Sequence, residues 1–221
     1  MSKITGCRQL AIMGGVSGIC GVLLLVSSFV INSGPPPGVT PEDLAHFAQQ
    51  NYARVLWGAW MQGVGPVLIV LFAFVLVHLA GASQQLAGWM TFFGATILMT
   101  VSLIEITFYI GALYRDPAIM SSVSLALISA VQHLYFTVAA PALFLPLGII
   151  LVSSRILPTV FGYLALVLAA TFVALGVVFL LRLTLPNAVT AFAGVQAFWW
   201  LAAAIALIAR RRKISGIPDA L

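Results

Sequence analysis

One carboxylate stands out because it falls inside a long apolar run. Glu105 lies within about 26 largely apolar residues, 88–113. A charged side chain at the centre of a bilayer costs from about 2.5 to more than 10 kcal/mol, so it needs a partner, a proton or a function. The other four acids all lie outside the apolar runs: Glu42, Asp43, Asp116 and Asp219. Glu105 is therefore the first candidate for chemistry.

Polar side chains occupy similar depths in three other apolar runs. Gln62 follows Arg54 by eight residues and Gln196 follows Asn187 by nine, while Glu105 precedes Tyr114 by nine. At 1.5 Å per residue these side chains lie roughly 12–14 Å below the outer membrane surface, and those of Gln132 and His133 roughly 15–18 Å below it. Polar groups avoid lipid and turn to the bundle interior, so we expect them to converge.

The strongest candidate pair is Glu105 with His133. A carboxyl group beside an imidazole can exchange a proton with it or form an ion pair, which suits proton-coupled transport or acid–base chemistry. The alternative is that Glu105 only pins two helices together. Helical spacing adds Tyr109 to the Glu105 stripe and Trp199 to the Gln196 stripe. The predicted ligand-binding and proton-handling residues are Glu105, His133, Gln62, Gln132, Gln196, Tyr109 and Trp199.

Several chemistries can be set aside. One buried carboxylate and one histidine are too few for a closed metal site, so none is predicted. His78 and His133 fall near opposite membrane surfaces and cannot clamp one haem iron, although haem held by a single histidine stays an alternative. Cys7 and Cys20 form neither a disulfide framework nor a CxxC motif. No P-loop, GxSxG or HExxH motif is present, so no catalytic residue and no cofactor is assigned.

The composition determines the protein class. Of the 221 residues, 62% are hydrophobic and only 7% are charged, whereas soluble domains carry about 25% charged residues. A helix needs about 20 apolar residues to cross the hydrocarbon layer. We predict an all-α, polytopic integral membrane protein, a single domain (1–221) with short loops. Its six transmembrane helices are expected at about 10–31, 53–79, 88–113, 122–152, 158–181 and 188–209.

The basic residues predict the orientation. Most of them fall on one side of a six-span chain, which the positive-inside rule makes cytoplasmic: Lys3, Arg8, Arg155, Arg210, Arg211, Arg212 and Lys213. Both termini are therefore predicted to be cytoplasmic, in a prokaryote-like inner (plasma) membrane. The net charge of +5 fits anionic lipid headgroups rather than nucleic acid, because the basic cluster is one four-residue helix end.

Two further stretches carry structural signals. In the outer loop 32–52, Thr40 and Pro41 are typical of a helix start, and a short amphipathic helix follows that should lie over the outer mouth. In the first helix, Gly14 and Gly18 allow close helix approach, either within the chain or in a homo- or hetero-oligomer. One glutamine in each of the second, fourth and sixth helices also suggests a repeat of three hairpins, or a chance similarity.

The sequence ranks three functions. The preferred hypothesis is an outer-leaflet polar pocket that binds or transports a small apolar or lipid-like molecule, with proton coupling through Glu105 and His133. The first alternative is an accessory subunit of a larger membrane complex. The second is an intramembrane enzyme that uses Glu105 and His133 as an acid–base pair.

Overall fold

The computed structural model describes residues 2–32, 40–114, 123, 127, 128, 130–181 and 186–214. In this part of the chain six helices are long and apolar enough to cross a membrane, and no strand occurs. The all-α six-helix bundle is thus confirmed. Its helices are α1 (Ser2–Ile31), α2 (Pro41–Gln50), α3 (Tyr52–Leu79), α4 (Leu86–Tyr114), the π-helical turn η1 (Tyr135–Ala139), α6 (Ala140–Ser154), α7 (Thr159–Leu180) and α8 (Pro186–Ile214).

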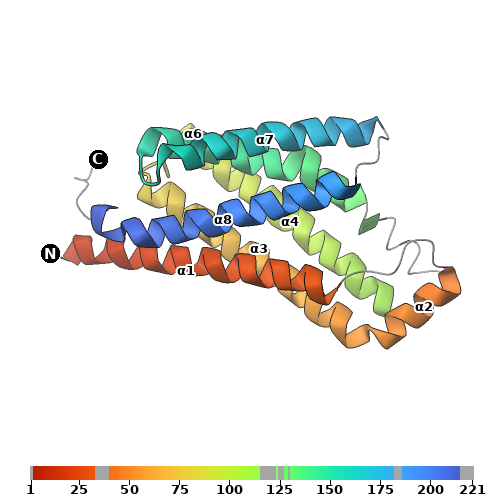
Figure 1. The fold of residues 1–221 in the computed structure, drawn as a ribbon. Coiled ribbons are helices and arrows are strands. Elements are labelled where there is room, and N and C mark those ends of the chain that lie inside the picture. Colours follow the sequence, from red (N-terminus) through yellow and green to blue (C-terminus); the bar gives the residue numbers. More distant parts are fainter. Residues whose placement is uncertain are drawn as a thin grey trace.

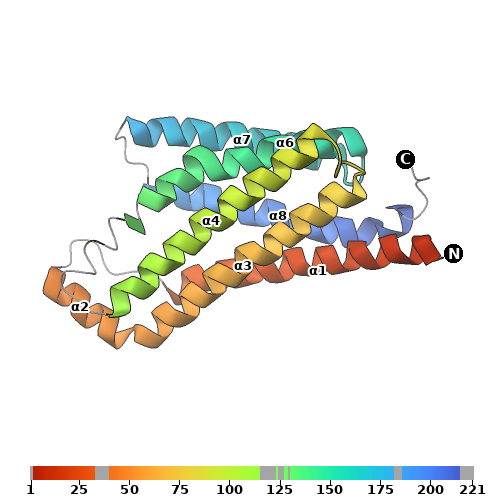
Figure 2. The ribbon, with the colours of Figure 1, turned by 180° about the vertical axis from the view of Figure 1, so that it is seen from behind.

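The six long helices pack side by side in the order α8, α1, α3, α4, α6 and α7 (Figures 1 and 2). The fourth of them is described from Ala130 and runs through η1 into α6. The start of α1 and the end of α8 lie at one end of the bundle, called the terminal end below, and α2 lies at the other. The first and last helices of this order, α8 and α7, are only loosely packed against each other, because α7 contacts α8 far less than it contacts α6.

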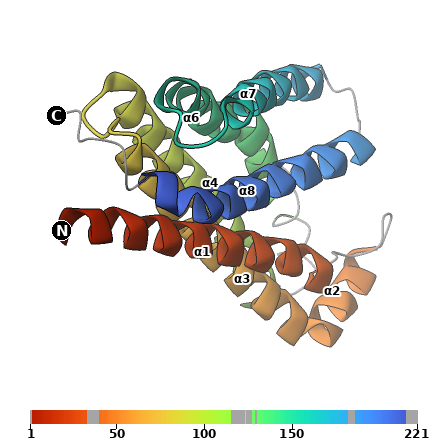
Figure 3. The same ribbon diagram turned by 60° about the vertical axis from the view of Figure 1, so that its left-hand side comes forward.

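The last helix packs mainly against the first, as Figure 3 shows. This arrangement departs from the predicted repeat of three hairpins, in which the fifth and sixth helices would form the third close pair. The small residues of α1 explain the departure. A Cβ added to Gly15 would lie 3.0 Å from the carbonyl oxygen of Ala204, so the two backbones nearly touch there.

The glycine face of α1 is filled within the chain. A Cβ at Gly18 would lie 2.9 Å from both the Ala204 Cβ atom and the Phe72 ring, and one at Gly21 would lie 2.8 Å from the carbonyl oxygen of Gly65. Gly14 faces Val75 of α3 in the same way. Small residues let helices approach closely enough for extensive van der Waals contact, which drives helix association in lipid. The Gly14 and Gly18 face therefore joins α1 to α3 and α8.

An aromatic cluster fills the centre of the bundle. Trp200 of α8 is 1% exposed, and its ring lies 5.2 Å from that of Phe144 and 5.9 Å from that of Phe72. Phe144 also stacks on Phe172 of α7 at 6.1 Å. Aromatic pairs at these separations contribute about 0.5–1.5 kcal/mol beyond the burial of their surface. The cluster links α3, α6, α7 and α8. It lies closer to the terminal end than the polar residues described next.

Prolines interrupt the regular hydrogen bonding of two of the membrane-crossing helices. Pro66 lies inside α3, and Pro146 lies inside α6. Pro141 follows the π-helical turn η1, in which the Ala140 N–H donates to the carbonyl oxygen of Tyr135, five residues back. Proline has no N–H and its ring collides with the preceding turn. The wider π turn accommodates this ring, and it changes the rotation of the side chains on either side.

The short helix α2 begins as the sequence indicates. Thr40 is its N-cap, with its Oγ1 accepting a hydrogen bond from the Asp43 N–H at 3.2 Å, and Pro41 is the first helical residue. The helix contacts α3 and α4. His46 is exposed, as expected of a solvated residue. The loop residues 33–39 lie outside the described residues, as does the whole 115–122 connection.

We predict that Gly18→Leu destabilises the bundle. The added side chain would collide with Ala204 and Phe72, and overpacking of this kind costs roughly 1–3 kcal/mol. The free energy of unfolding in detergent should fall by that amount. Gly194→Leu is the control, because a Cβ there meets no atom within 4 Å. Equal effects of the two substitutions would contradict the packing described here.

Candidate functional site

The Glu105 carboxyl group is held by two side-chain amides from neighbouring helices. Gln132 Nε2 donates a hydrogen bond to Glu105 Oε1 at 3.1 Å, and the Gln62 side chain also hydrogen-bonds the carboxyl group. Gln62 is buried, with 5% of its surface exposed. Three of the predicted residues, from three separate helices, therefore meet at one point inside the bundle.

Close packing of α3 on α4 brings Gln62 to Glu105. A Cβ added to Gly63 would lie 2.9 Å from Ile106 Cδ1, so glycine at this position lets the two helices approach beside the polar pair. Gln62 is the eleventh residue of α3, and Glu105 lies nine residues before the end of α4. The two helices run in opposite directions. Equal depths from the α2 end thus place the two side chains at the same level.

A second polar pair lies next to the first. Tyr135, the first residue of η1, donates its hydroxyl proton to Gln196 Oε1 of α8 at 2.7 Å. Gln196 is 6% exposed, so this hydroxyl supplies a hydrogen bond that lipid could not. The bond also ties α8 to the fourth membrane-crossing helix. Gln196 thus meets Tyr135 and not the carboxyl group directly.

The two pairs lie close to each other. Glu105 interacts electrostatically with the hydroxyl groups of both Tyr109 and Tyr135. Gln132 and Tyr135 are three residues apart, so they share a face of their helix. The polar layer therefore crosses α3, α4, the fourth membrane-crossing helix and α8. We call it the Glu105 site, and its residues are Gln62, Glu105, Tyr109, Gln132, Tyr135 and Gln196.

Tyr135 was not among the predicted site residues. A tyrosine in an apolar run is typical of a core or interfacial position, and such residues carry no specific signal of a site. The available signal was its spacing of three residues from Gln132. Ser102, which precedes Glu105 by one helical turn, is also buried beside the site at 7% exposure.

Two of the predicted site residues, His133 and Trp199, have other surroundings than the residues of the Glu105 site. His133 follows Gln132 directly, and its side chain is exposed; its backbone carbonyl accepts a hydrogen bond from Thr137 Oγ1 at 2.7 Å. Trp199 is 3% exposed, and its indole N–H donates to the carbonyl oxygen of Phe161 at 3.1 Å. The hydrogen bond of the Trp199 indole N–H therefore joins α8 to α7 and stabilises the packing of the bundle.

The chemistry open to the Glu105 site follows from its groups. A carboxyl group with amide and hydroxyl neighbours can bind a hydrogen-bond donor or a cation, or carry a proton. Among the described residues, no group of three His, Cys, Asp or Glu side chains could hold a metal ion. No family model, no curated protein and no solved structure matches this chain.

We predict that Tyr135 and Gln196 are energetically coupled. Tyr135→Phe leaves the buried amide of Gln196 without its hydroxyl partner, and should lower the free energy of unfolding. Interhelical hydrogen bonds in membranes contribute about 0.6 kcal/mol on average and up to about 1.7. A double-mutant cycle with Gln196→Leu, measured by unfolding in detergent, should give a coupling energy in this range. Strict additivity of the two substitutions would show that the bond contributes nothing.

Proposed function

We propose that this membrane protein binds or transports a small apolar or lipid-like molecule at the Glu105 site, with the molecule's polar group engaging the carboxyl group. The observation that supports this most is the hydrogen-bonded carboxyl group itself. Three polar side chains from separate membrane-crossing helices converge on one another. An intramembrane ionisable residue of this kind marks a functional site by default.

The exposure of the site residues supports access from the bilayer. Glu105 and Tyr109 are only half-buried, and Gln132 is exposed on a helix that crosses the membrane. Gln62 and Gln196 are buried behind them. The polar groups thus extend from the bundle interior to its lipid-facing side. A molecule dissolved in the bilayer can reach the carboxyl group sideways while its apolar part stays among lipid chains.

Proton handling is the second part of the proposal. Glu105 is the acid of the site, and His133 is a titratable group one residue along from its partner Gln132. When a protonated carboxyl group takes up a cation, it releases its proton, so that the charge of the site stays the same. Histidine is the side chain suited to relay that proton near neutral pH. Transport through this site would then be proton-coupled.

Glu105→Gln should abolish ligand binding while the fold is kept. The amide preserves the size of the side chain but cannot carry the carboxyl charge or its proton. Native mass spectrometry of gently extracted protein should show a bound small molecule in the unmutated chain and at least a tenfold loss in the variant. The control is Thr107→Val on the same helix, because its hydroxyl only donates to the Leu103 carbonyl oxygen at 2.8 Å.

Other outcomes of that experiment point elsewhere. Undiminished binding in Glu105→Gln would contradict the proposed site. A protein partner retained by all forms would favour the accessory-subunit alternative. Chemical turnover of the bound molecule, lost in both Glu105→Gln and His133→Gln, would favour the intramembrane enzyme.

We further propose the inner membrane as the location, with the terminal end of the bundle in the cytoplasm. The support is charge: Arg8, Arg155, Arg210 and Arg211 lie at that end, whereas Glu42 and Asp43 belong to α2 at the other. An excess of basic residues in short loops and helix ends marks the cytoplasmic side. The Glu105 site, which lies nearer the α2 end, would then belong to the outer leaflet.

Thiol labelling tests this orientation. In a chain with Cys7 and Cys20 replaced by serine, an impermeant maleimide should label His46→Cys on α2 in intact cells. It should label Gln84→Cys, in the turn between α3 and α4, only after permeabilisation. Both positions are exposed, so access decides the result. The reverse pattern would overturn the proposed orientation.

A further inference from the structure

The charges of the membrane-crossing helices are unevenly distributed. Glu105 lies nine residues before the end of α4, inside its membrane-crossing span. In the part of the chain that the structure describes, every lysine and arginine lies outside such a span or within three residues of its end. These residues are Lys3, Arg8, Arg54, Arg155, Arg210, Arg211, Arg212 and Lys213. The described residues therefore offer Glu105 no ammonium or guanidinium partner at its depth.

The two amides that hold Glu105 carry no charge. Gln132 Nε2 donates to Glu105 Oε1 at 3.1 Å, and the Gln62 side chain hydrogen-bonds the carboxyl group as well. The two oxygens of a carboxylate together accept about four hydrogen bonds. The amides thus solvate the carboxyl group inside the bundle, leave part of its acceptor capacity open and do not neutralise it.

The titratable neighbours of Glu105 leave the same gap. The hydroxyls of Tyr109 and Tyr135 are neutral or, once ionised, negative. His133 lies one residue further along than Gln132, about 100° around the helix, and its side chain is exposed. As a proton relay, His133 spends part of each cycle as a neutral imidazole. In that state a positive charge for Glu105 has to come with the occupant.

The lipid side of the site is apolar. Leu103 and Ile104 of α4 are exposed, and so is Leu134, which follows Gln132 by two residues. Gln132 is itself exposed on its membrane-crossing helix. An occupant can therefore keep an alkyl chain against these side chains and the surrounding lipid while a compact polar head reaches the carboxyl group.

Three kinds of head can be compared at this carboxyl group. An anionic head would be repelled by the carboxylate, and a neutral alcohol would form only ordinary hydrogen bonds. A protonated amine would form an ion pair whose charge-assisted hydrogen bonds are roughly twice as strong. The low dielectric of the surroundings strengthens this pairing further. The charge balance of the site thus favours the amine.

Building on the function proposed above, we propose that the molecule bound at the Glu105 site is a lipophilic amine in its protonated form. The ammonium group donates to the Glu105 carboxylate, and the alkyl part lies among lipid chains beside α4. Where Glu105 holds a proton before binding, the ammonium takes the place of that proton, which is released. The total charge of the site is then the same before and after binding.

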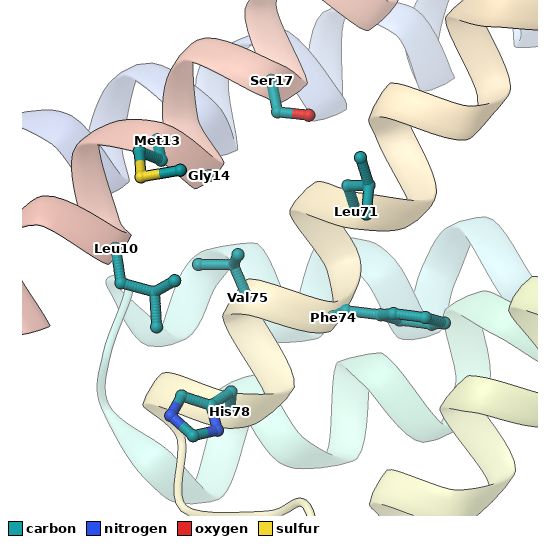
Figure 4. A pocket seen from close by; sticks show the side chains of 8 residues that line it. All are labelled: Leu10, Met13, Gly14, Ser17, Leu71, Phe74, Val75 and His78. Atoms are coloured by element: carbon teal, nitrogen blue, oxygen red, sulfur yellow. The ribbon is translucent and has the colours of Figure 1, made fainter.

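A second opening in the bundle serves as the internal control. It is an apolar groove of about 440 Å³ between α1 and α3, near the terminal end (Figure 4). Leu10, Met13 and Leu71 are among its lining residues, and none of the described lining residues is an acid. The groove can hold an alkyl chain but gives no reason to prefer an ammonium head over a hydroxyl head.

The test measures how tightly nanodiscs of phosphatidylcholine that hold the protein retain radiolabelled dodecylamine, dodecanol or dodecanesulfonate at neutral pH. Empty nanodiscs give the background of each probe, and the three probes share one alkyl chain. The amine should bind at least tenfold more tightly than the alcohol, and the sulfonate should stay at the background. Equal binding of the amine and the alcohol would overturn the proposed amine.

Variants at position 105 assign the preference to the carboxyl group. Glu105→Gln should bind the amine no more tightly than the alcohol, whereas Glu105→Asp, which keeps a carboxyl group, should retain most of the preference. Met13→Trp should fill the groove between α1 and α3 and leave the preference unchanged. Thermal unfolding checks that all three variants fold.

A charge placed inside the protein should compete with the occupant. Gln132→Lys brings an ammonium group to Glu105, and should lower the binding of dodecylamine at least tenfold. Gln132→Met is the matched control, because it removes the same amide bond and adds no charge, and its loss should be clearly smaller. Equal losses in the two variants would contradict the proposed ion pair.

The outcomes separate this inference from the proposed function. Equal binding of amine and alcohol, with both reduced tenfold in Glu105→Gln, would overturn the amine and leave the Glu105 site in place. A preference for the amine that survives in Glu105→Gln, or that is lost in Met13→Trp, would contradict both proposals. No binding of any probe above the background would do the same.

Discussion

Every polar group within the membrane-crossing helices needs a partner inside the protein, because lipid offers none. The threonines of α4 meet this requirement locally: the hydroxyls of Thr91, Thr96, Thr100 and Thr107 each donate to the carbonyl four residues back. Glu105 and the glutamines cannot do so, since their groups are larger and reach beyond their own helix. They bond between helices instead. The same constraint that stabilises the bundle thus assembles the site.

Much of this arrangement could be predicted from depth alone. Helical rise places Gln62 and Glu105 at one level, and the avoidance of lipid turns them inward, so their meeting needs no further information. Gln132 reaches the carboxyl group for the same reason. Sequence reasoning could not predict which residue Gln196 bonds. The π-helical turn after Leu134 shifts the helix register, and it presents Tyr135 to α8.

The order of the helices around the bundle was also beyond the sequence. Glycines at positions 14, 18 and 21 show that α1 approaches something closely, but a small-residue face does not name its partner. The partner depends on matching shapes across the whole interface: Val75 and Phe72 on α3, and Ala204 on α8. These matches involve residues far apart in the chain and carry no local pattern. The hairpin repeat predicted from three glutamines therefore did not include the pairing of the first helix with the last.

That pairing has a consequence for biosynthesis. Gly15 packs beside Ile208, a residue made about 190 positions later. At synthesis rates of 5–20 residues per second, α1 waits roughly 10–40 s before its second partner exists. During that interval its glycine face is bordered by α3 on one flank and by lipid or the insertion machinery on the other. Completion of the fold therefore waits for the synthesis of α8, and a chain truncated before α8 would leave an open interface for quality-control proteases to recognise.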